Sequence, residues 1–154
     1  MKIIFLDIDG VLNSLKYDMS RSPDDSNIDI TRLPLLKKLV DSTKAKIVLT
    51  SSWRKFWEKD EAVISQTGKE INEIFASAGL EIFDKTPIKS TRKDEILAWL
   101  SSNNKVKSFC IIDDMALGWE ELTAFTVITN PRIGHGLEQR HIQKAVEILK
   151  NTSN

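Results

Sequence analysis

The sequence has one cysteine and two histidines in 154 residues, and its 22 basic side chains balance its 22 acidic ones. A single cysteine excludes an internal disulfide framework and fits a reducing compartment. Zero net charge gives no overall field that would favour nucleic acid or a membrane surface, although it allows a local basic patch. No apolar stretch approaches the roughly 20 residues of a membrane-spanning helix. We therefore expect a cytoplasmic protein that does not enter a membrane.

Hydrophobic residues make up 41% of the chain, which at this length fits one compact domain. We expect this domain to span residues 1–150, followed by a C-terminal tail at 151–154. Five short apolar runs have the composition of β-strands. They are about Lys2–Leu6, Ala45–Thr50, Leu80–Phe83, Lys107–Ile112 and Phe125–Thr129.

Segments with helical spacing separate most of these strands. Their apolar faces start near Leu33, Ile71, Ile96 and Ile142, and Gly79 is a candidate cap for the second helix. Strand–helix alternation predicts an α/β fold with a mainly parallel five-stranded sheet between two layers of helices. This is a three-layer, Rossmann-like α/β/α sandwich. The polar segment 14–27 is expected to be an irregular excursion.

The first predicted strand runs directly into two aspartates. Side chains alternate along an extended chain, so Asp7 and Asp9 share a face. Two carboxylates this close repel each other unless a cation lies between them or one holds a proton. Such a pair at the end of a buried strand costs stability, which indicates a chemical role.

Ligands of an open parallel sheet gather at the carboxyl ends of its strands. The first strand delivers Asp7 and Asp9 to that edge, and the fourth delivers Asp113 and Asp114. The second delivers a run of hydroxyls that suits an anion, Thr50, Ser51 and Ser52. The sequence therefore predicts an acidic and anion-binding site at this edge.

A basic cluster precedes the third predicted helix. Thr91 with Asp94 three residues later resembles a capping box, which makes Thr91 the expected N-cap. Arg92 and Lys93 would then lie at the positive end of the helix dipole, where cations are disfavoured. A solvated turn would explain them at a cost of only a few tenths of a kcal/mol. Beside the other groups, we interpret Lys89, Arg92 or Lys93 as facing a bound anion.

Carboxylates, water and phosphate oxygens are the ligands that Mg²⁺ prefers. A zinc site is not indicated, because His135 and His141 are isolated near the C-terminal end of the sequence. We expect both histidines at the surface.

In this order along the chain, the four groups resemble the four motifs of the haloacid dehalogenase (HAD) superfamily of phosphohydrolases. The matching residues are the DxDGVLN run from Asp7 to Asn13, Thr50-Ser51, the Lys89/Arg92/Lys93 region and Asp113-Asp114. Two further stretches resemble the small phosphatase-like domains of RNA-repair fusion proteins. They are Leu49-Thr50-Ser51-Ser52-Trp53-Arg54 and Arg92…Glu95-Ile96…Trp99-Leu100.

The resemblance implies a role for each motif. Asp7 would attack phosphorus and form an aspartyl-phosphate, and Asp9 would be the general acid and base. The Mg²⁺ ligands would come from Asp7, the backbone carbonyl of Asp9 and the Asp113-Asp114 pair, with Asp114 favoured as the direct ligand.

The resemblance also implies phosphate-binding groups, and here the sequence leaves alternatives open. The hydroxyl that binds phosphate is Thr50 or Ser51. The family usually has a lysine in its third motif, whereas Arg92 stands at the aligned position with Lys93 beside it. Members of the family often carry an inserted cap domain, but both insertion intervals are short here. We therefore expect a minimal cap and an open site.

An open site predicts a large phosphorylated substrate, such as a phosphoprotein or a nucleic-acid end. Asn13, Trp53 and Arg54 are possible substrate contacts, since an aromatic ring can stack on a base and an arginine can bind phosphate. Packing of Trp53 on the sheet is an equally good explanation for that residue.

Three other classes of protein are alternatives. A phosphoacceptor receiver module also combines acids, a hydroxyl and a lysine on a parallel sheet, but in a different order along the chain. A nucleotide-sugar transferase also binds a cation with DxD, but within a larger domain. A binding domain without catalysis is disfavoured, because Asp7 and Asp9 are both retained.

Overall fold

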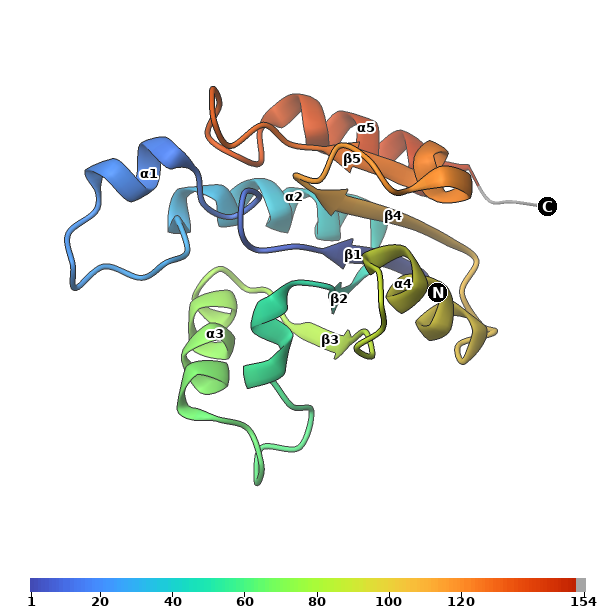
Figure 1. The fold of residues 1–154 in the computed structure, drawn as a ribbon, viewed down its shortest axis with the longest axis horizontal. Helices are drawn as coiled ribbons and strands as arrows, with labels where there is room; N and C mark the ends of the chain where they lie inside the picture. The colour runs from blue at the N-terminus through green and yellow to red at the C-terminus, as the bar shows by residue number, and fades with distance from the viewer. Residues whose placement is uncertain (152–154) are drawn as a thin grey trace.

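The computed structural model describes residues 1–151, so the part of the predicted tail at 152–154 lies outside the described residues. Five parallel strands form one sheet in the order β3-β2-β1-β4-β5 (Figure 1). The strands are β1 (Lys2–Leu6), β2 (Lys46–Leu49), β3 (Ile82–Lys85), β4 (Ser108–Asp113) and β5 (Thr126–Ile128). The predicted α/β sandwich with a parallel five-stranded sheet is confirmed.

The helices alternate with the strands as the sequence predicts. They are α1 (Leu15–Ser20), α2 (Leu33–Thr43), α3 (Gln66–Ser77), α4 (Arg92–Ser101) and α5 (Gln139–Lys150). Three short 3₁₀ helices are η1 (Ile30–Arg32), η2 (Ser52–Phe56) and η3 (Glu120–Phe125). Among the five α-helices only α1 was not expected, and the three 3₁₀ helices were not predicted either. Helix α1 is short and buries none of its residues, so its sequence carries no apolar periodicity.

Alternation along β1 divides the core into two layers. Ile4 and Leu6 belong to the larger apolar cluster, which includes residues of α2, α3 and α5. Ile3 and Phe5 belong to the smaller cluster on the other face, with residues of α4 and η3. The buried face of α4 therefore packs on the side of the sheet toward which odd-numbered residues of β1 point.

The strand ends differ from the predicted ones for local reasons. The largest difference is β3, which begins at Ile82 rather than near Leu80. Gly79 adopts a positive φ of 71°, and the Leu80 amide donates back to the Phe75 carbonyl at 2.9 Å. Leu80 therefore closes the end of α3, as the glycine predicted, instead of starting the strand.

Two predictions about single residues have opposite outcomes. Cys110 is fully buried in β4, as expected, and burial raises the pKa of its thiol. The prediction that His141 lies at the surface is wrong, because only 4% of this residue is exposed. Its Nδ1 accepts a hydrogen bond from the Glu138 amide at 2.9 Å, so the imidazole helps to cap α5. Burial lowers the pKa of His141 and favours its neutral form.

The intervals in which a cap domain would lie contain only small elements. Between β1 and β2 the chain forms α1, η1 and α2, and between β2 and β3 it forms η2 and α3. The carboxyl edge of the sheet is therefore not covered by an inserted domain within residues 1–151. In the same part of the chain, none of the helices combines the length and the apolar character needed to cross a membrane.

Candidate active site

The register of the sheet aligns three of the predicted site residues. Leu6 of β1 pairs with Leu49 of β2 and with Ile112 of β4. The residues that follow, Asp7, Thr50 and Asp113, therefore form a row across three neighbouring strands. Two backbone hydrogen bonds continue the ladder into this row. The Asp7 amide donates to the Ile112 carbonyl and the Thr50 amide donates to the Leu6 carbonyl, both at 3.0 Å.

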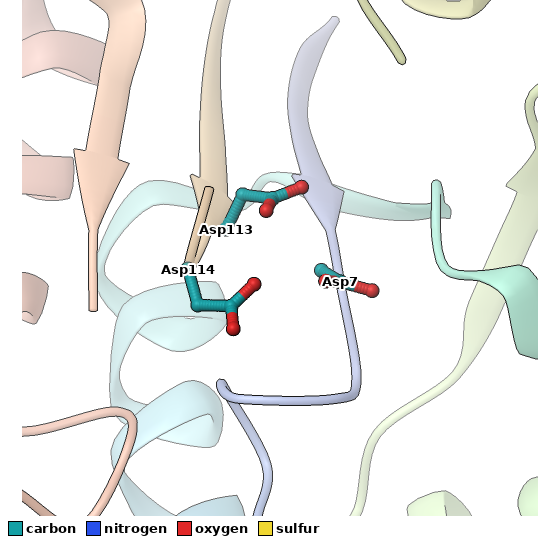
Figure 2. Close-up of side chains that lie close together, drawn as sticks. All are labelled: Asp7, Asp113 and Asp114. Carbon is teal, nitrogen blue, oxygen red and sulfur yellow. The ribbon is translucent and has the colours of Figure 1, made fainter. Parts of the chain in front are cut away.

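Asp7, Asp113 and Asp114 form a cluster of carboxylates, with one oxygen from each within 4.8 Å of the others. Figure 2 shows the Asp113 and Asp114 side chains pointing from the end of β4 toward the strand that carries Asp7. Asp7 and Asp113 are buried, whereas Asp114 is exposed. Gly10 is required beside them, because it has a φ of +78° and a Cβ there would overlap the Asp114 carboxylate.

Arg92 is the cation that the fold brings to this cluster. Its Nη1 lies 2.7 Å from Asp113 Oδ2 and 3.5 Å from Asp7 Oδ1. Lys93 turns away, with its Nζ 3.1 Å from a Glu120 carboxylate oxygen in η3. Arg92 stands in the first turn of α4, whose N-cap is Thr91 as predicted. The other candidate of the basic group, Lys89, is exposed.

The cluster carries more negative charge than Arg92 can balance. Burial raises the pKa of Asp7 to about 7, and the neighbouring Asp113 contributes to this rise against the opposing effect of Arg92. Burial also raises the pKa of Asp113. Such shifts mean that ionising both groups at neutral pH is costly unless another positive charge is present.

The donor set fits a hard divalent cation. Three carboxylates at one point supply oxygen ligands only, and one of them is open to solvent. Mg²⁺ binds through one or two carboxylates plus water and substrate phosphate, which matches this partly exposed arrangement. The unbalanced negative charge described above is what a cation would neutralise. These residues therefore fit a metal such as Mg²⁺.

The raised pKa of Asp7 predicts a pH-dependent contribution to stability. The folded protein holds this proton more tightly than the unfolded chain, in which the pKa is 3.8. The stabilisation is complete below pH 3.8 and is lost as the pH rises to about 7. We compare the melting temperature of the metal-free wild type with that of metal-free Asp7→Asn. The wild-type value minus the variant value should decrease as the pH is raised from about 5 to about 8.

Added Mg²⁺ competes with this proton for the same oxygens, so it should raise the melting temperature more at about pH 8 than at about pH 5. Differential scanning fluorimetry of both proteins at the two pH values measures this. An Mg²⁺-induced shift that is equal at both pH values, or equal in Asp7→Asn, would contradict the assignment of Asp7 to the cation site.

Asp9 lies outside the carboxylate cluster and faces solvent. Its Oδ2 accepts a hydrogen bond from the indole of Trp53 at 3.0 Å, and its Oδ1 accepts one from Asn13 Nδ2 at 3.1 Å. Asn13 is itself fixed, because its Oδ1 accepts from the Gly10 amide at 2.7 Å. The structure therefore holds Asp9 in one orientation through two side chains that the sequence suggested as possible substrate contacts.

The hydroxyl run after β2 separates into three different environments. Thr50 is fully buried, and its Oγ1 has no hydrogen-bond partner within residues 1–151. Ser51 caps η2, since its Oγ accepts from the Trp53 amide at 3.2 Å. Ser52 is exposed. An unpaired buried hydroxyl beside Asp7 leaves Thr50 available to a ligand.

The structure places Arg54 inside the protein rather than at the mouth of the site, with only 6% of the residue exposed. Its Nη1 donates to the carbonyls of Thr50 and Ser51, both at 2.9 Å. Its Nη2 donates to Glu95 at 2.5 Å. Arg54 therefore stabilises the loop that carries Thr50 and Ser51. Its role as a substrate contact remains a prediction.

Glu95 belongs to one of the stretches that carry the family resemblance, but the sequence interpretation gave it no role in the site. It is buried, pairs with Arg54, and lies 3.6 Å from Arg92 Nε. It also accepts a hydrogen bond from the Lys89 amide at 3.3 Å. One signal was available: Glu95 precedes the buried Trp99 by four residues on α4, so it shares the apolar face of that helix.

One known protein family matches most of the chain. The family described as "HAD domain in Swiss Army Knife RNA repair proteins" matches residues 3–142 of the chain. No curated protein and no solved structure gives a significant match. The matched region contains all four groups of residues described above.

Proposed function

The chain belongs to the family of HAD domains found in Swiss Army Knife RNA repair proteins, and from this premise we propose that it is a Mg²⁺-dependent phosphomonoester hydrolase. The family suggests a hydrolase of the phosphatase type. One observation carries the proposal furthest: Asp7, Asp113 and Asp114 converge on one point, with Arg92 beside them. This arrangement would supply a nucleophile, oxygen ligands for a cation and a positive charge beside them.

The proposed reaction has two steps, both at Asp7. Its carboxylate attacks phosphorus, the bond from phosphorus to the leaving oxygen breaks, and an aspartyl-phosphate forms. Asp9 gives its proton to the leaving oxygen and then accepts a proton from the water that attacks the intermediate. That attack releases inorganic phosphate and restores the Asp7 carboxylate. The hydrogen bonds from Trp53 and Asn13 hold Asp9 at the solvent side, from which a leaving group departs.

Asp7, Asp113 and Asp114 would hold the metal, and the backbone carbonyl of Asp9 remains a predicted fourth ligand. The bound cation would neutralise charge on the transferring phosphoryl group. Arg92 would stabilise the same charge from its position between Asp7 and Asp113. Thr50, with its unpaired buried hydroxyl, is the proposed donor to a phosphoryl oxygen, and Ser51 keeps its role as a helix cap.

We propose that the substrate is the terminal phosphate of a nucleic-acid strand, and that RNA is the strand concerned. The family description names RNA repair proteins. The absence of an inserted domain over the site, within residues 1–151, supports a substrate that covers the site itself. A phosphoprotein has the same reactive group and is the competing substrate class.

Phosphate release from a generic phosphomonoester tests the function directly. We expect p-nitrophenyl phosphate to be hydrolysed over many turnovers with Mg²⁺, and the activity to disappear with excess EDTA. The competing receiver-type module would accept a phosphoryl group from acetyl phosphate without catalytic turnover. A single stoichiometric phosphorylation with no sustained release of phosphate would therefore overturn the proposal. A parallel panel of phosphopeptides and of 5′- and 3′-phosphorylated oligonucleotides compares the substrate classes.

A further inference from the structure

Two grooves flank the site, and their charges are opposite in sign. One, of about 410 Å³, lies between the loop before η1 and α3 and includes Trp53. Its acidic lining residues are Asp24, Asp25, Glu70 and Glu73. The other groove, of about 600 Å³, includes Asp114, Arg132 and Arg140, and we call it the arginine pocket. A polyanion leaving the site is repelled by the first groove and attracted by the second.

The arginine pocket is continuous with the carboxylate cluster, because Asp114 belongs to both. The segment after β5 that lines it is fixed against the turn after β1. Thr129 Oγ1 donates to the Gly10 carbonyl at 2.7 Å, and the Leu137 amide donates to the Val11 carbonyl at 2.8 Å. Figure 1 shows α1 and the loop between β5 and α5 on the same side of the molecule. The pocket therefore has a defined position relative to Asp7.

The two arginines have no strong structural partner in the fold. Arg132 is exposed, and no carboxylate within residues 1–151 lies at ion-pair distance from its side chain. Arg140 has a side chain that is 65% exposed, and its Nε lies 3.6 Å from a Glu138 oxygen, an arrangement that contributes little. Arg140 also stands in the first turn of α5, where the helix dipole disfavours a cation. An anionic ligand would account for both residues.

We propose that the arginine pocket binds a second phosphate of the substrate, the phosphodiester next to the terminal phosphate of a single-stranded oligonucleotide. This inference rests on the proposed phosphatase function, which places the terminal phosphate at Asp7. Guanidinium groups bind phosphate through paired, charge-assisted hydrogen bonds, which suits Arg132 and Arg140 to this role. The volume of the pocket lies in the range that holds small ligands. Ile133, also in its lining and exposed, offers an apolar contact to the nucleoside between the two phosphates.

Steady-state kinetics with three substrates tests the pocket. They are p-nitrophenyl phosphate, a dinucleotide with a terminal phosphate, and the same dinucleotide with an uncharged methylphosphonate linkage. The preference is the kcat/KM for the charged dinucleotide divided by that for p-nitrophenyl phosphate. We expect it to fall about tenfold in R132A/R140A, which corresponds to about 1.4 kcal/mol. The uncharged dinucleotide should show no such fall.

A matched control removes two cations at the opposite edge of the sheet. Lys105 precedes β4, and Lys150 ends α5 near the start of β4. The K105A/K150A variant should keep the wild-type preference. A preference that is unchanged in R132A/R140A, or that falls equally in K105A/K150A, would overturn the proposal. So would equal kcat/KM values of the wild type for the charged and uncharged dinucleotides.

Binding without turnover separates this inference from the proposed function. Fluorescence anisotropy of a labelled, phosphorylated oligonucleotide is measured with the metal-free protein at several salt concentrations. R132A/R140A should bind about tenfold more weakly, with a salt slope smaller by about 0.7 for the lost phosphate contact. If no phosphomonoester is hydrolysed but R132A/R140A still binds the oligonucleotide more weakly, the proposed phosphatase function is wrong and the binding role of the arginine pocket is supported. Tighter binding of a doubly phosphorylated peptide than of the oligonucleotide would overturn the nucleic-acid assignment.

Discussion

Replacing Asp7 with asparagine is expected to lower Mg²⁺-dependent phosphate release by on the order of 10³-fold or more. The substitution removes the nucleophile of the proposed first step and one of the three carboxylates of the proposed cation site. It changes the shape of the side chain very little. The asparagine amide would keep an oxygen to accept the hydrogen bond that the Ile8 amide now donates to Asp7 at 2.9 Å. The measurement is kcat/KM for p-nitrophenyl phosphate in the presence of Mg²⁺.

Folding of this variant needs an independent check, and a control is available elsewhere in the chain. Asp60→Asn makes the same chemical change at an exposed loop, where Asp60 accepts a hydrogen bond from the Ala62 amide. It should retain wild-type activity. Asp7→Asn should also melt no earlier than wild type at about pH 8, because it removes a buried carboxyl whose pKa is raised by burial. A folded Asp7→Asn protein with full activity would eliminate Asp7 as the nucleophile.

Replacing Glu95 with alanine is expected to give the largest loss of stability, about 3–5 kcal/mol in the free energy of unfolding. Glu95 and Arg54 are each only 6% exposed, so the variant leaves the Arg54 guanidinium buried without its anion. Arg54 also supports the carbonyls of Thr50 and Ser51, which links the pair to the hydroxyl loop. Urea denaturation, followed by tryptophan fluorescence, measures the change.

Two comparisons separate the cost of an unpaired charge from a general cost of mutation. The double variant Arg54→Met/Glu95→Leu removes both charges and should recover much of the lost stability, since apolar replacements of a buried ion pair are often neutral. Glu58→Ala removes the anion of the Lys85 pair, whose glutamate side chain is 43% exposed, and should cost less than about 1 kcal/mol. If Glu95→Ala costs no more than Glu58→Ala, the buried pair does not brace the site.

Much of the architecture is predictable because it depends on local pattern. Apolar runs and helical spacing located every strand and every α-helix with a buried face, and β1 was located to the residue. The caps at Gly79 and Thr91 were predictable too, because each depends only on the backbone of residues close by in the sequence. The short helix α1 was missed for the same reason, since it has no buried face to leave a periodic signal.

The sequence by itself determined the order of the strands and helices along the chain and the presence of acids and hydroxyls at the strand ends. These groups meet because the strands are parallel. Asp7, Thr50 and Asp113 each directly follow a residue that is paired with its neighbour in the sheet. Which side chain occupies which place was decided only by the tertiary structure. Arg92 rather than Lys93 faces Asp7, because η3, far along the chain, brings Glu120 to Lys93.

Similar long-range contacts decided the remaining positions. Arg54 lies in the interior because Glu95, on a distant helix, supplies its anion. Asp9 has a fixed orientation because the indole of Trp53, from the segment after β2, donates to it. Such contacts join residues tens of positions apart, and their energies depend on burial and on the distance between charges. A sequence pattern expresses the periodicity of single elements, whereas burial and charge distances exist only once the elements have packed.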